Sequence, residues 1–475
     1  MWRVMWQYGS SRMGPMTAAV APDLQGVLDA KALLWKDLNA YGDPEPVFSE
    51  HPALLRTSML ALPHLQADPA MDLAGYAHVF VPTQQQALTL VNRLRAERDI
   101  VYADMQGEWQ YPVKFGQSRR VPTAEILLSV PVPGTPDLSS EQGYLGPAPA
   151  GIDALYAWTI PGGRGTGVRI VDIENGWNFG HEDLKGNDNG VIYGPHSDND
   201  HGTAVLGIFH GDANIFGVTG IASQSSLSAA AVMYDFKLRK WNAAAAIKFA
   251  ADRMAQGDVI LLEMHAPGPN THGNNSKSQQ GFISIEYWLP EFAAIKYATG
   301  KGIHVVEAGG NGGENLDAPI YNNAFSRTVR DSGAILVGGG NSAHDAHPRS
   351  RIWWSNYGSR VDVQGWGLDI VTTGGRSEPS YYDRISSADE SKCYTQSFGG
   401  TSGASPIITG AVASISGALK AAGRATLPPS EMRQLMVETG TAQSDAPDFP
   451  SATQHIGPLP DLRAAFSRLT LGGVA

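Results

Sequence analysis

The sequence predicts an α/β domain with a mainly parallel sheet, preceded by a small α+β unit. Three observations lead to this prediction. After Gly151, short aliphatic runs alternate with helical runs, which is the order that builds a parallel sheet. Before residue 107, a strand–helix–strand pattern stands by itself. Residues 107–150 are rich in Pro and Gly and lack periodicity, which indicates a linker between the two regions.

The N-terminal region is expected to contain two kinds of structure. Residues 1–75 predict an N-terminal extension that is partly helical, with helices over 27–38 and 51–62. Residues 76–106 predict a more regular unit. Its strand, helix and second strand are expected at 76–81, 84–96 and 100–103.

Residues 151–475 predict a single α/β domain. The expected strands cover 167–172, 227–232, 258–262, 303–306, 334–337 and 361–363. The expected helices cover 202–210, 241–256, 283–299, 402–422, 431–439 and 461–469. Little sequence is left for an appended C-terminal domain.

Composition limits the class of protein. The chain has 475 residues, of which 42% are hydrophobic and 17% charged, as in a globular protein of more than one domain. Its net charge of −11 argues against nucleic acid and anionic membranes as partners, because both need basic surface. One Cys excludes an internal disulfide framework. Because we find no apolar run of signal-peptide or membrane-spanning length, a cytoplasmic location is the default expectation, with secretion by another route as the open alternative.

Four glycine-rich junctions carry the residues that suggest chemistry. Asp172 ends a strand, His201 begins a helix, Asn311 follows a buried strand, and Ser402 lies in the segment 399–406 before a helix. Each residue alone could be an ordinary turn or cap residue. Their occurrence together favours nucleophilic catalysis, because glycines and a helix N-terminus let a substrate approach free N–H groups.

The residue types fit that chemistry. A serine hydroxyl is a weak nucleophile, so an imidazole must take its proton. A buried carboxylate then stabilises the charged imidazole and fixes its tautomer. Preorganised donors hold the oxyanion that forms on the substrate.

Four segments resemble the subtilisin-like serine proteases (subtilases), over residues 151–469: VRIVDIENGWNFGHEDL, NDHGTAVLGI, GIHVVEAGGNGG and GGTSGASPIITGA. The order Asp, His, Ser is the one found in subtilisin. The resemblance implies a subtilisin-like three-layer domain that hydrolyses peptide bonds through an acyl-enzyme. It makes Ser402 the nucleophile, His201 the general base, Asp172 the orienting acid, and Asn311 an oxyanion donor beside the N–H of Ser402.

The resemblance also interprets the N-terminal region. Subtilase propeptides are small strand–helix domains that assist folding and then occupy the substrate cleft, and residues 76–106 resemble one. It implies a self-inhibited precursor whose partners are a protein or peptide substrate and its own N-terminal region. We expect removal of residues 1 to about 120, with Ser118-Arg119-Arg120 as a candidate processing point.

The acid motif departs from the family pattern. Subtilases usually carry Asp-Ser/Thr-Gly, whereas this chain has Asp172-Ile173-Glu174. In a continuing strand, Glu174 shares a face with Asp172 and adds negative potential near His201, unless it points to solvent.

The expected substrate wall departs most. Family resemblance places substrate contacts at Glu263, Met264, His265, Ala308, Gly309 and Gly310. Glu263 and Glu307 replace small residues, and two carboxylates at a specificity pocket would select a basic side chain. The alternative is that both carboxylates pair internally or face away.

The remaining expectations concern cofactors and alternative functions. Catalysis needs no cofactor. Many subtilases carry structural calcium, and Asp183, Asp188 and Asp198 are candidate ligands without EF-hand spacing, or else solvated loop acids. His201 and Asn311 argue against a sedolisin-like acidic protease, which uses Glu and Asp instead, and favour activity near neutral or alkaline pH. Two alternative functions are a narrow-specificity maturation protease that trims a leader and a catalytically silent binding module.

Overall fold

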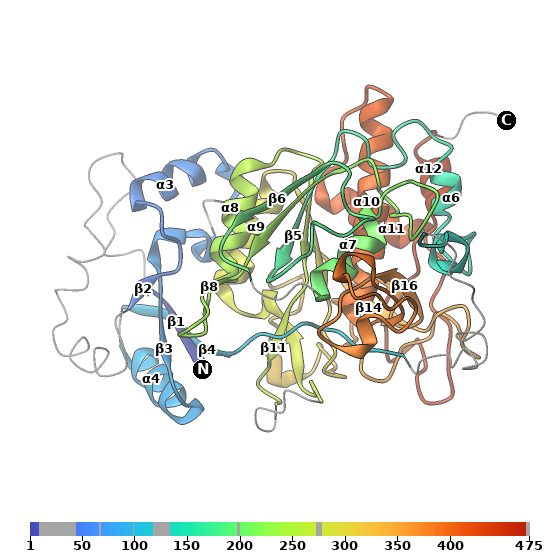
Figure 1. The fold of residues 1–475 in the computed structure, drawn as a ribbon. Coiled ribbons are helices and arrows are strands. Elements are labelled where there is room, and N and C mark those ends of the chain that lie inside the picture. The colour runs from blue at the N-terminus through green and yellow to red at the C-terminus, as the bar shows by residue number, and fades with distance from the viewer. Residues whose placement is uncertain are drawn as a thin grey trace.

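The computed structural model describes residues 1–8, 44–65, 68–97, 99–116, 134–196, 200–271 and 278–471. Two parts are visible in Figure 1, a smaller N-terminal unit in blue and a large α/β domain in green to red. A cyan segment leads out of the N-terminal unit and across the large domain (Figure 1).

A seven-stranded sheet forms the centre of the large domain. All neighbouring strands are parallel, in the order β15-β14-β13-β10-β5-β7-β6. The bounds are β5 (Arg169–Glu174), β6 (Asp188–Tyr193), β7 (Ser226–Ala231), β10 (Val259–Leu262), β13 (His304–Ala308), β14 (Ile335–Gly340) and β15 (Val363–Trp366). Most central strands are short aliphatic runs buried on both faces, as in other parallel sheets. The predicted α/β class is confirmed.

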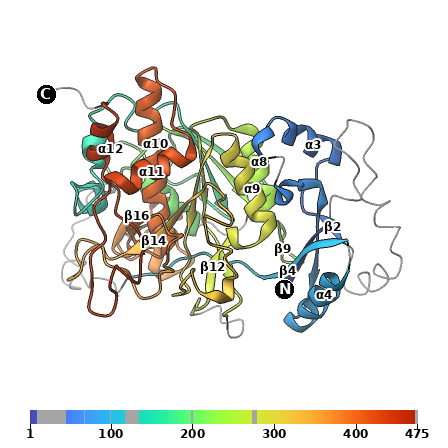
Figure 2. The same ribbon diagram turned by 180° about the vertical axis from the view of Figure 1, so that it is seen from behind.

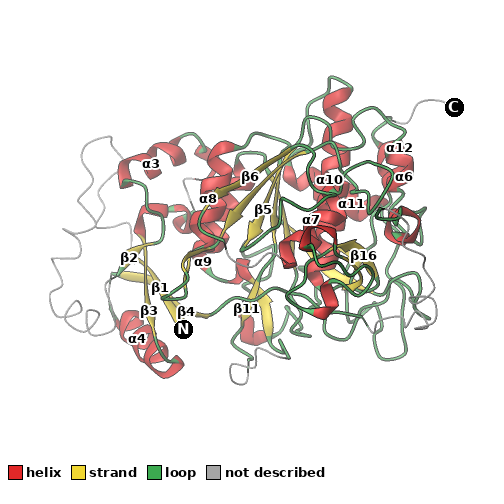
Figure 3. Ribbon diagram, viewed as in Figure 1, coloured by secondary structure: helices red, strands yellow, loops and turns green. Residues whose placement is uncertain are grey.

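Helices cover both faces of this sheet, so the domain has three layers (Figures 1, 2 and 3). On one face lie α8 (Ala243–Arg253) and α9 (Leu289–Gly300), and on the other α7 (Asp200–His210) and α10 (Thr401–Ala421). The short helices near α10 are α6 (Ala154–Ala157), α11 (Pro429–Thr439) and α12 (Leu462–Arg468). By length and composition α10 could cross a membrane, but it is buried inside the protein, as a core helix is.

Three small antiparallel pairs extend the domain. They are β8 (Met233–Asp235) with β9 (Lys240–Trp241), β11 (His265–Pro267) with β12 (Phe282–Ser284), and β16 (Ile370–Thr373) with β17 (Tyr394–Phe398). The helix expected over 283–299 therefore starts later than predicted. Residues 282–284 pair with β11, and α9 begins only at Leu289, with Pro290 in its first turn.

The N-terminal unit is a four-stranded antiparallel sheet in the order β2-β3-β1-β4. Its elements are β1 (Trp2–Tyr8), β2 (Glu45–Pro46), α3 (Pro52–Leu60), β3 (Tyr76–Val81), α4 (Gln84–Ala96) and β4 (Ile100–Gly107). The first residues of the chain thus form a central strand, whereas the sequence interpretation placed residues 1–75 outside this unit. Strand β1 lacks polar–apolar alternation because both its faces are buried, and even Arg3 is inaccessible. The helix expected over 27–38 lies outside the described residues.

A buried ion pair joins the N-terminal unit to the large domain. The guanidinium of Arg3 on β1 lies 2.6 Å from the carboxylate of Glu291 on α9, and both side chains are inaccessible to solvent. Arg3 also donates to Nδ1 of His78 at 2.7 Å and to Oδ1 of Asn242 at 3.2 Å. Removing one partner of such a pair leaves a buried charge uncompensated, so this contact fixes how the two parts dock.

Candidate active site

His201, the second residue of α7, is held by Glu174. Strand β5 continues two residues beyond Asp172 and ends at Glu174. Nδ1 of His201 lies 2.8 Å from Oε2 of Glu174, and both side chains are at most 1% exposed. A carboxylate at this distance accepts a hydrogen bond from Nδ1–H, which fixes the tautomer and stabilises the charged ring.

The expectation that Asp172 orients His201 is wrong. Oδ2 of Asp172 instead accepts a hydrogen bond from Nε1 of Trp177 at 2.6 Å. The Trp177 ring packs against Gly202, where an added Cβ would lie 2.4 Å from it. Asp172 therefore supports the start of α7 rather than the imidazole. Burial, followed by the negative charge of Glu174, raises the pKa of Asp172 well above its usual value, which favours the neutral form of its carboxyl.

Ser402 is the second residue of α10 and is fully buried. Its backbone N–H donates to the carbonyl oxygen of Pro112 at 3.1 Å. Its hydroxyl makes no hydrogen bond of ordinary geometry with any described residue. Gly400 precedes the helix with φ of 90°, and a Cβ there would lie 2.1 Å from the Pro112 oxygen. Glycine at this position thus permits both the turn and the approach of a peptide carbonyl.

Asn311 lies beside the start of α10. Its Oδ1 accepts hydrogen bonds from the N–H and the hydroxyl of Thr401, at 3.0 and 3.1 Å. Its backbone N–H donates to Nδ1 of His265 at 3.2 Å. Its Nδ2 donates to Oε1 of Gln279 at 3.1 Å. The side-chain donor expected for an oxyanion is therefore present at the site and directed to another acceptor.

Residues 110–116, expected to be linker, cross the site as an added strand. Gln110 pairs with His265 on β11 through two backbone hydrogen bonds of 2.9 and 3.1 Å. Val113 pairs with Gly400, and the N–H of Lys114 donates to Gly399 at 3.2 Å. Figure 1 shows this segment in cyan running from β4 past β11. The chain therefore passes Ser402 as an extended peptide paired on both sides.

Tyr111 within this segment contacts the imidazole directly. Its ring stacks on the ring of His201, with centroids 4.0 Å apart and planes 13° from parallel. The Tyr111 carbonyl accepts a hydrogen bond from Nε2 of Gln279 at 2.8 Å. Gln279 thereby links the segment to Asn311. No sequence motif marks Gln279, so only the fold reveals its place.

The residues expected to contact substrate lie around this segment. His265 begins β11 and forms the backbone pair with Gln110, and Met264 precedes it. On the other side, Ala308 ends β13, and the N–H of Gly310 donates to the Thr401 hydroxyl at 3.1 Å. Gly309 is tied to the sheet by its N–H, which donates to Val337 at 2.8 Å.

The two carboxylates expected to select a basic side chain do not border an open pocket. Glu263 and Glu307 are both fully buried. Oε1 of Glu263 lies 2.5 Å from the Ser405 hydroxyl, and Oε1 of Glu307 accepts from the N–H of Glu286 at 2.9 Å. Both carboxylates pair internally, as the alternative interpretation expects. They therefore give no reason to expect selection of an Arg or Lys side chain in the substrate.

The residues expected as calcium ligands do not form a cluster among the described residues. Asp183 Oδ1 accepts from Nδ2 of Asn214 at 2.7 Å, and its Oδ2 accepts from the N–H of Val218 at 2.6 Å. Asp188 begins β6, and Asp198 lies outside the described residues. In the described part of the chain, no group of three or more His, Cys, Asp or Glu residues could hold a metal ion.

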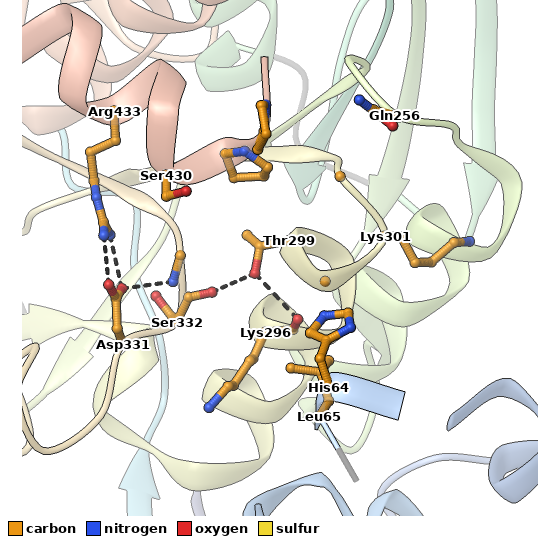
Figure 4. A pocket seen from close by; sticks show the side chains of 15 residues that line it. His64, Leu65, Gln256, Lys296, Thr299, Lys301, Asp331, Ser332, Ser430 and Arg433 are labelled. Carbon is orange, nitrogen blue, oxygen red and sulfur yellow. Dashed lines mark hydrogen bonds and ion pairs between the residues drawn. The ribbon is translucent and has the colours of Figure 1, made fainter. Parts of the chain in front are cut away.

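A cavity of about 460 Å³ lies apart from these residues, and no residue of the candidate site lines it. Figure 4 shows its walls, to which His64 of the N-terminal unit and Arg433 of α11 contribute. Asp331 is paired with Arg433 at 2.5 Å, and the Thr299 hydroxyl donates to the Ser332 carbonyl at 2.6 Å (Figure 4). Its polar groups largely satisfy one another, and we assign it no chemistry.

Comparison with known protein families decides the classification. The family model described as the subtilase family, Peptidase_S8, matches residues 150–454. This chain belongs to the subtilase family. It is accordingly a subtilisin-like serine protease.

Relatives of this subtilase agree. Thermitase of Thermoactinomyces vulgaris is 32% identical over 252 residues, which cover 51% of this chain and 75% of thermitase. The thermophilic serine proteinase of Bacillus sp. (strain AK1) is also 32% identical over 252 residues, 50% of this chain and 53% of that protein. A calcium-dependent protease of Nostoc sp. (strain PCC 7120 / SAG 25.82 / UTEX 2576) is 27% identical over 288 residues, 56% of this chain and 41% of that protein.

Solved structures show the same fold. Fervidolysin from Fervidobacterium pennivorans, a keratinolytic enzyme related to subtilisin, matches with a TM-score of 0.57 and 16% identity, over 98% of this chain and 60% of that one. The epidermin leader peptide processing serine protease (EpiP) from Staphylococcus aureus matches with a TM-score of 0.53 and 16% identity, over 98% of both chains.

The family pattern now explains the acid. The usual subtilase motif is Asp-Ser/Thr-Gly, and its glycine lies two residues after the acid. Glu174-Asn175-Gly176 keeps that spacing, whereas Asp172 does not. The position of Gly176 is therefore a signal in the sequence that points to Glu174. Asp172 is the residue type usual in the family, and for that reason the sequence interpretation assigned the role to Asp172.

Proposed function

We propose that this subtilase is a serine endopeptidase whose catalytic residues are Ser402, His201 and Glu174. The buried contact of 2.8 Å between His201 and Glu174 carries the proposal. Tyr111 stacks on His201, and the next residue, Pro112, accepts the N–H of Ser402, so one short segment contacts both residues. The N–H of Ser402, already bonded to a peptide carbonyl, supports it further. Peptide hydrolysis by an acyl-enzyme is the reaction for which these groups are suited.

The residues have distinct tasks in this reaction. As Ser402 Oγ attacks the carbonyl carbon, its proton passes to Nε2 of His201, because Nδ1 is engaged by Glu174. Glu174 stabilises the imidazolium. The oxyanion accepts hydrogen bonds from the N–H of Ser402 and from Nδ2 of Asn311. To donate there, Nδ2 of Asn311 must first break its hydrogen bond to Gln279. His201 then protonates the leaving amine, and water attacks the acyl-enzyme through the same base.

We further propose that the chain is made as a self-inhibited precursor. Residues 110–114 pair with His265 on one side and with Gly400 on the other and lie against Ser402, so another peptide cannot pair there until they leave. The Pro112–Val113 peptide bond is the one whose carbonyl oxygen meets the Ser402 N–H, which makes it the bond for self-cleavage. The earlier candidate point, residues 118–120, lies outside the described residues.

A fluorophosphonate probe that reacts with activated serines tests the enzyme function. We expect labelling of the chain once residues 110–114 have been displaced or cleaved, and none in Ser402→Ala. Absence of labelling after confirmed removal of that segment would support the alternative of a silent binding module. A narrow-specificity maturation protease would instead label normally but cleave few members of a peptide library.

A structural calcium ion in this protein stays a proposal. A relative from Nostoc carries the name calcium-dependent protease, but the described residues offer no ligand cluster here. Melting curves with and without EDTA check for a structural ion.

A further inference from the structure

The hydroxyl of Ser405, one turn after Thr401 on α10, has two close partners. Its Oγ lies 2.6 Å from the carbonyl oxygen of Thr401 and 2.5 Å from Oε1 of Glu263. A hydroxyl carries one proton and can donate only one of these bonds. Because a carbonyl oxygen cannot donate, the two contacts are two full two-centre hydrogen bonds, rather than one proton shared between two acceptors, only if Glu263 carries a proton and gives it to Ser405.

The surroundings of Glu263 favour the same state. Glu263 is fully buried directly after β10. Burial raises its pKa well above the usual value, and the negative charges of Asp172 and Glu174 raise it further. Titratable groups on the elements around it include Asp172 and Glu174 on β5, His201 on α7, His265 on β11 and Glu307 on β13. Asp172 and Glu174 repel a negative charge on Glu263.

The hydrogen bonds continue from Ser405 to the oxyanion donor. Thr401, whose carbonyl Ser405 engages, donates both its N–H and its hydroxyl to Oδ1 of Asn311. Ser402 lies between these two anchored residues, and its hydroxyl is close enough to Glu263 to stabilise a carboxylate there. One continuous set of contacts thus runs from Glu263 through the nucleophile turn to Asn311.

We propose that Glu263 is a positioning residue whose protonated carboxyl holds Ser405 against Thr401 and so fixes Ser402 and Asn311. This proposal rests on the proposed protease function. Glu263 makes and breaks no bond in the substrate. When Glu263 loses its proton, Ser405 turns its single proton to the carboxylate and releases the Thr401 carbonyl. The turn then loses one bond, and turnover falls as the pH rises through the pKa of Glu263.

Kinetics of matched variants across the pH range test the proposal. Glu263→Gln presents a permanent N–H to Ser405, so we expect it to keep most of kcat and to lose the alkaline decline of the wild type. Glu263→Leu removes the donor, and we expect kcat to fall about tenfold to a hundredfold, with KM nearly unchanged. Glu307→Gln, a buried carboxyl on the neighbouring strand bonded to Glu286, is the control and should keep the decline.

Two results would overturn the proposal: an unchanged alkaline decline in Glu263→Gln, or a loss of kcat in Glu263→Gln as large as in Glu263→Leu. A second measurement does not depend on activity. In the Ser402→Ala background, the infrared band of a protonated carboxyl should shrink on Glu263→Gln. A band that does not change contradicts this proposal alone, whereas absent fluorophosphonate labelling of the wild type contradicts the protease function.

Discussion

Two carboxylates two residues apart on β5 have different partners because they stand at different depths of the sheet. Glu174 ends the strand and reaches the second residue of α7, whereas Asp172 lies further inside and reaches Trp177. The side chain of Glu is also one carbon longer than the Asp usual in the family. Position at the strand end, together with the longer side chain, thus explains why Glu174 is the acid that contacts His201.

Glu174→Gln and Asp172→Asn therefore have very different expected effects. Gln leaves His201 in the wrong tautomer, and we expect kcat to fall by about 10⁴, the loss known for the corresponding acid-to-amide change in another serine protease. Asn can still accept the hydrogen bond of Trp177, and it replaces a carboxyl whose charged form is disfavoured by burial, so its cost should stay below about tenfold. Steady-state kinetics on one peptide substrate compares kcat of the two variants. A larger loss in Asp172→Asn than in Glu174→Gln would show that Asp172, and not Glu174, orients His201.

Residue patterns located three of the functional junctions but not the fourth. The glycine-rich motifs around Ser402, His201 and Asn311 mark places where strands meet helices, and such junctions are visible in a sequence. Glu174 was passed over because Asp172 matched the usual acid. Glu263 and Gln279 carry no motif, and their roles follow only from partners far along the chain, such as Ser405 and Tyr111.

The conformation of segment 110–116 depends on partners that are distant in the sequence. It lacks periodicity, so the sequence indicates only a linker. In the fold its backbone pairs with His265 on one side and Gly400 on the other, and it runs as an extended segment between them. Strands β1 and β6 were missed for related reasons. Strand β1 is buried on both faces, and β6, with sequence DNGVIY, begins with polar and glycine residues.

Tyr111→Ala tests how firmly this element is held. Loss of the ring stack on His201 removes about 0.5–1.5 kcal/mol of binding free energy. A synthetic peptide covering residues 108–116 with Ala at this position should therefore inhibit the mature enzyme about two- to tenfold less well than the wild-type peptide. The Tyr111→Phe peptide keeps the ring and serves as control. Equal inhibition by all three peptides would show that the stack contributes nothing to docking.

At the scale of the whole molecule, the N-terminal unit docks through a buried polar contact that depends on pH. Nδ1 of His78 accepts a hydrogen bond from Arg3, so His78 must be neutral. Burial, followed by the charge of Arg3, lowers the pKa of His78 from 6.5 to about 4. Between these two values the unfolded state binds more protons than the folded state, and stability falls as the pH falls.

His78→Gln should reduce this acid sensitivity, because a Gln oxygen can accept the bond from Arg3 and does not titrate. A shift of this size corresponds to about 3 kcal/mol of unfolding free energy lost on acidification. His181 and His304, whose pKa values are also lowered to about 4, keep some acid sensitivity in the variant. Unfolding monitored at several pH values compares the two proteins, and identical slopes would exclude His78 as a contributor.

Docked in this way, the N-terminal unit brings the Pro112 carbonyl to the N–H of Ser402, where the proposed self-cleavage would begin. Mass spectrometry of the purified protein tests this central claim most directly. The account predicts a new N-terminus at Val113 in the wild type, none in Ser402→Ala, and greatly slowed formation in Glu174→Gln. Full activity in an uncleaved chain, or the same Val113 terminus in Ser402→Ala, would contradict it.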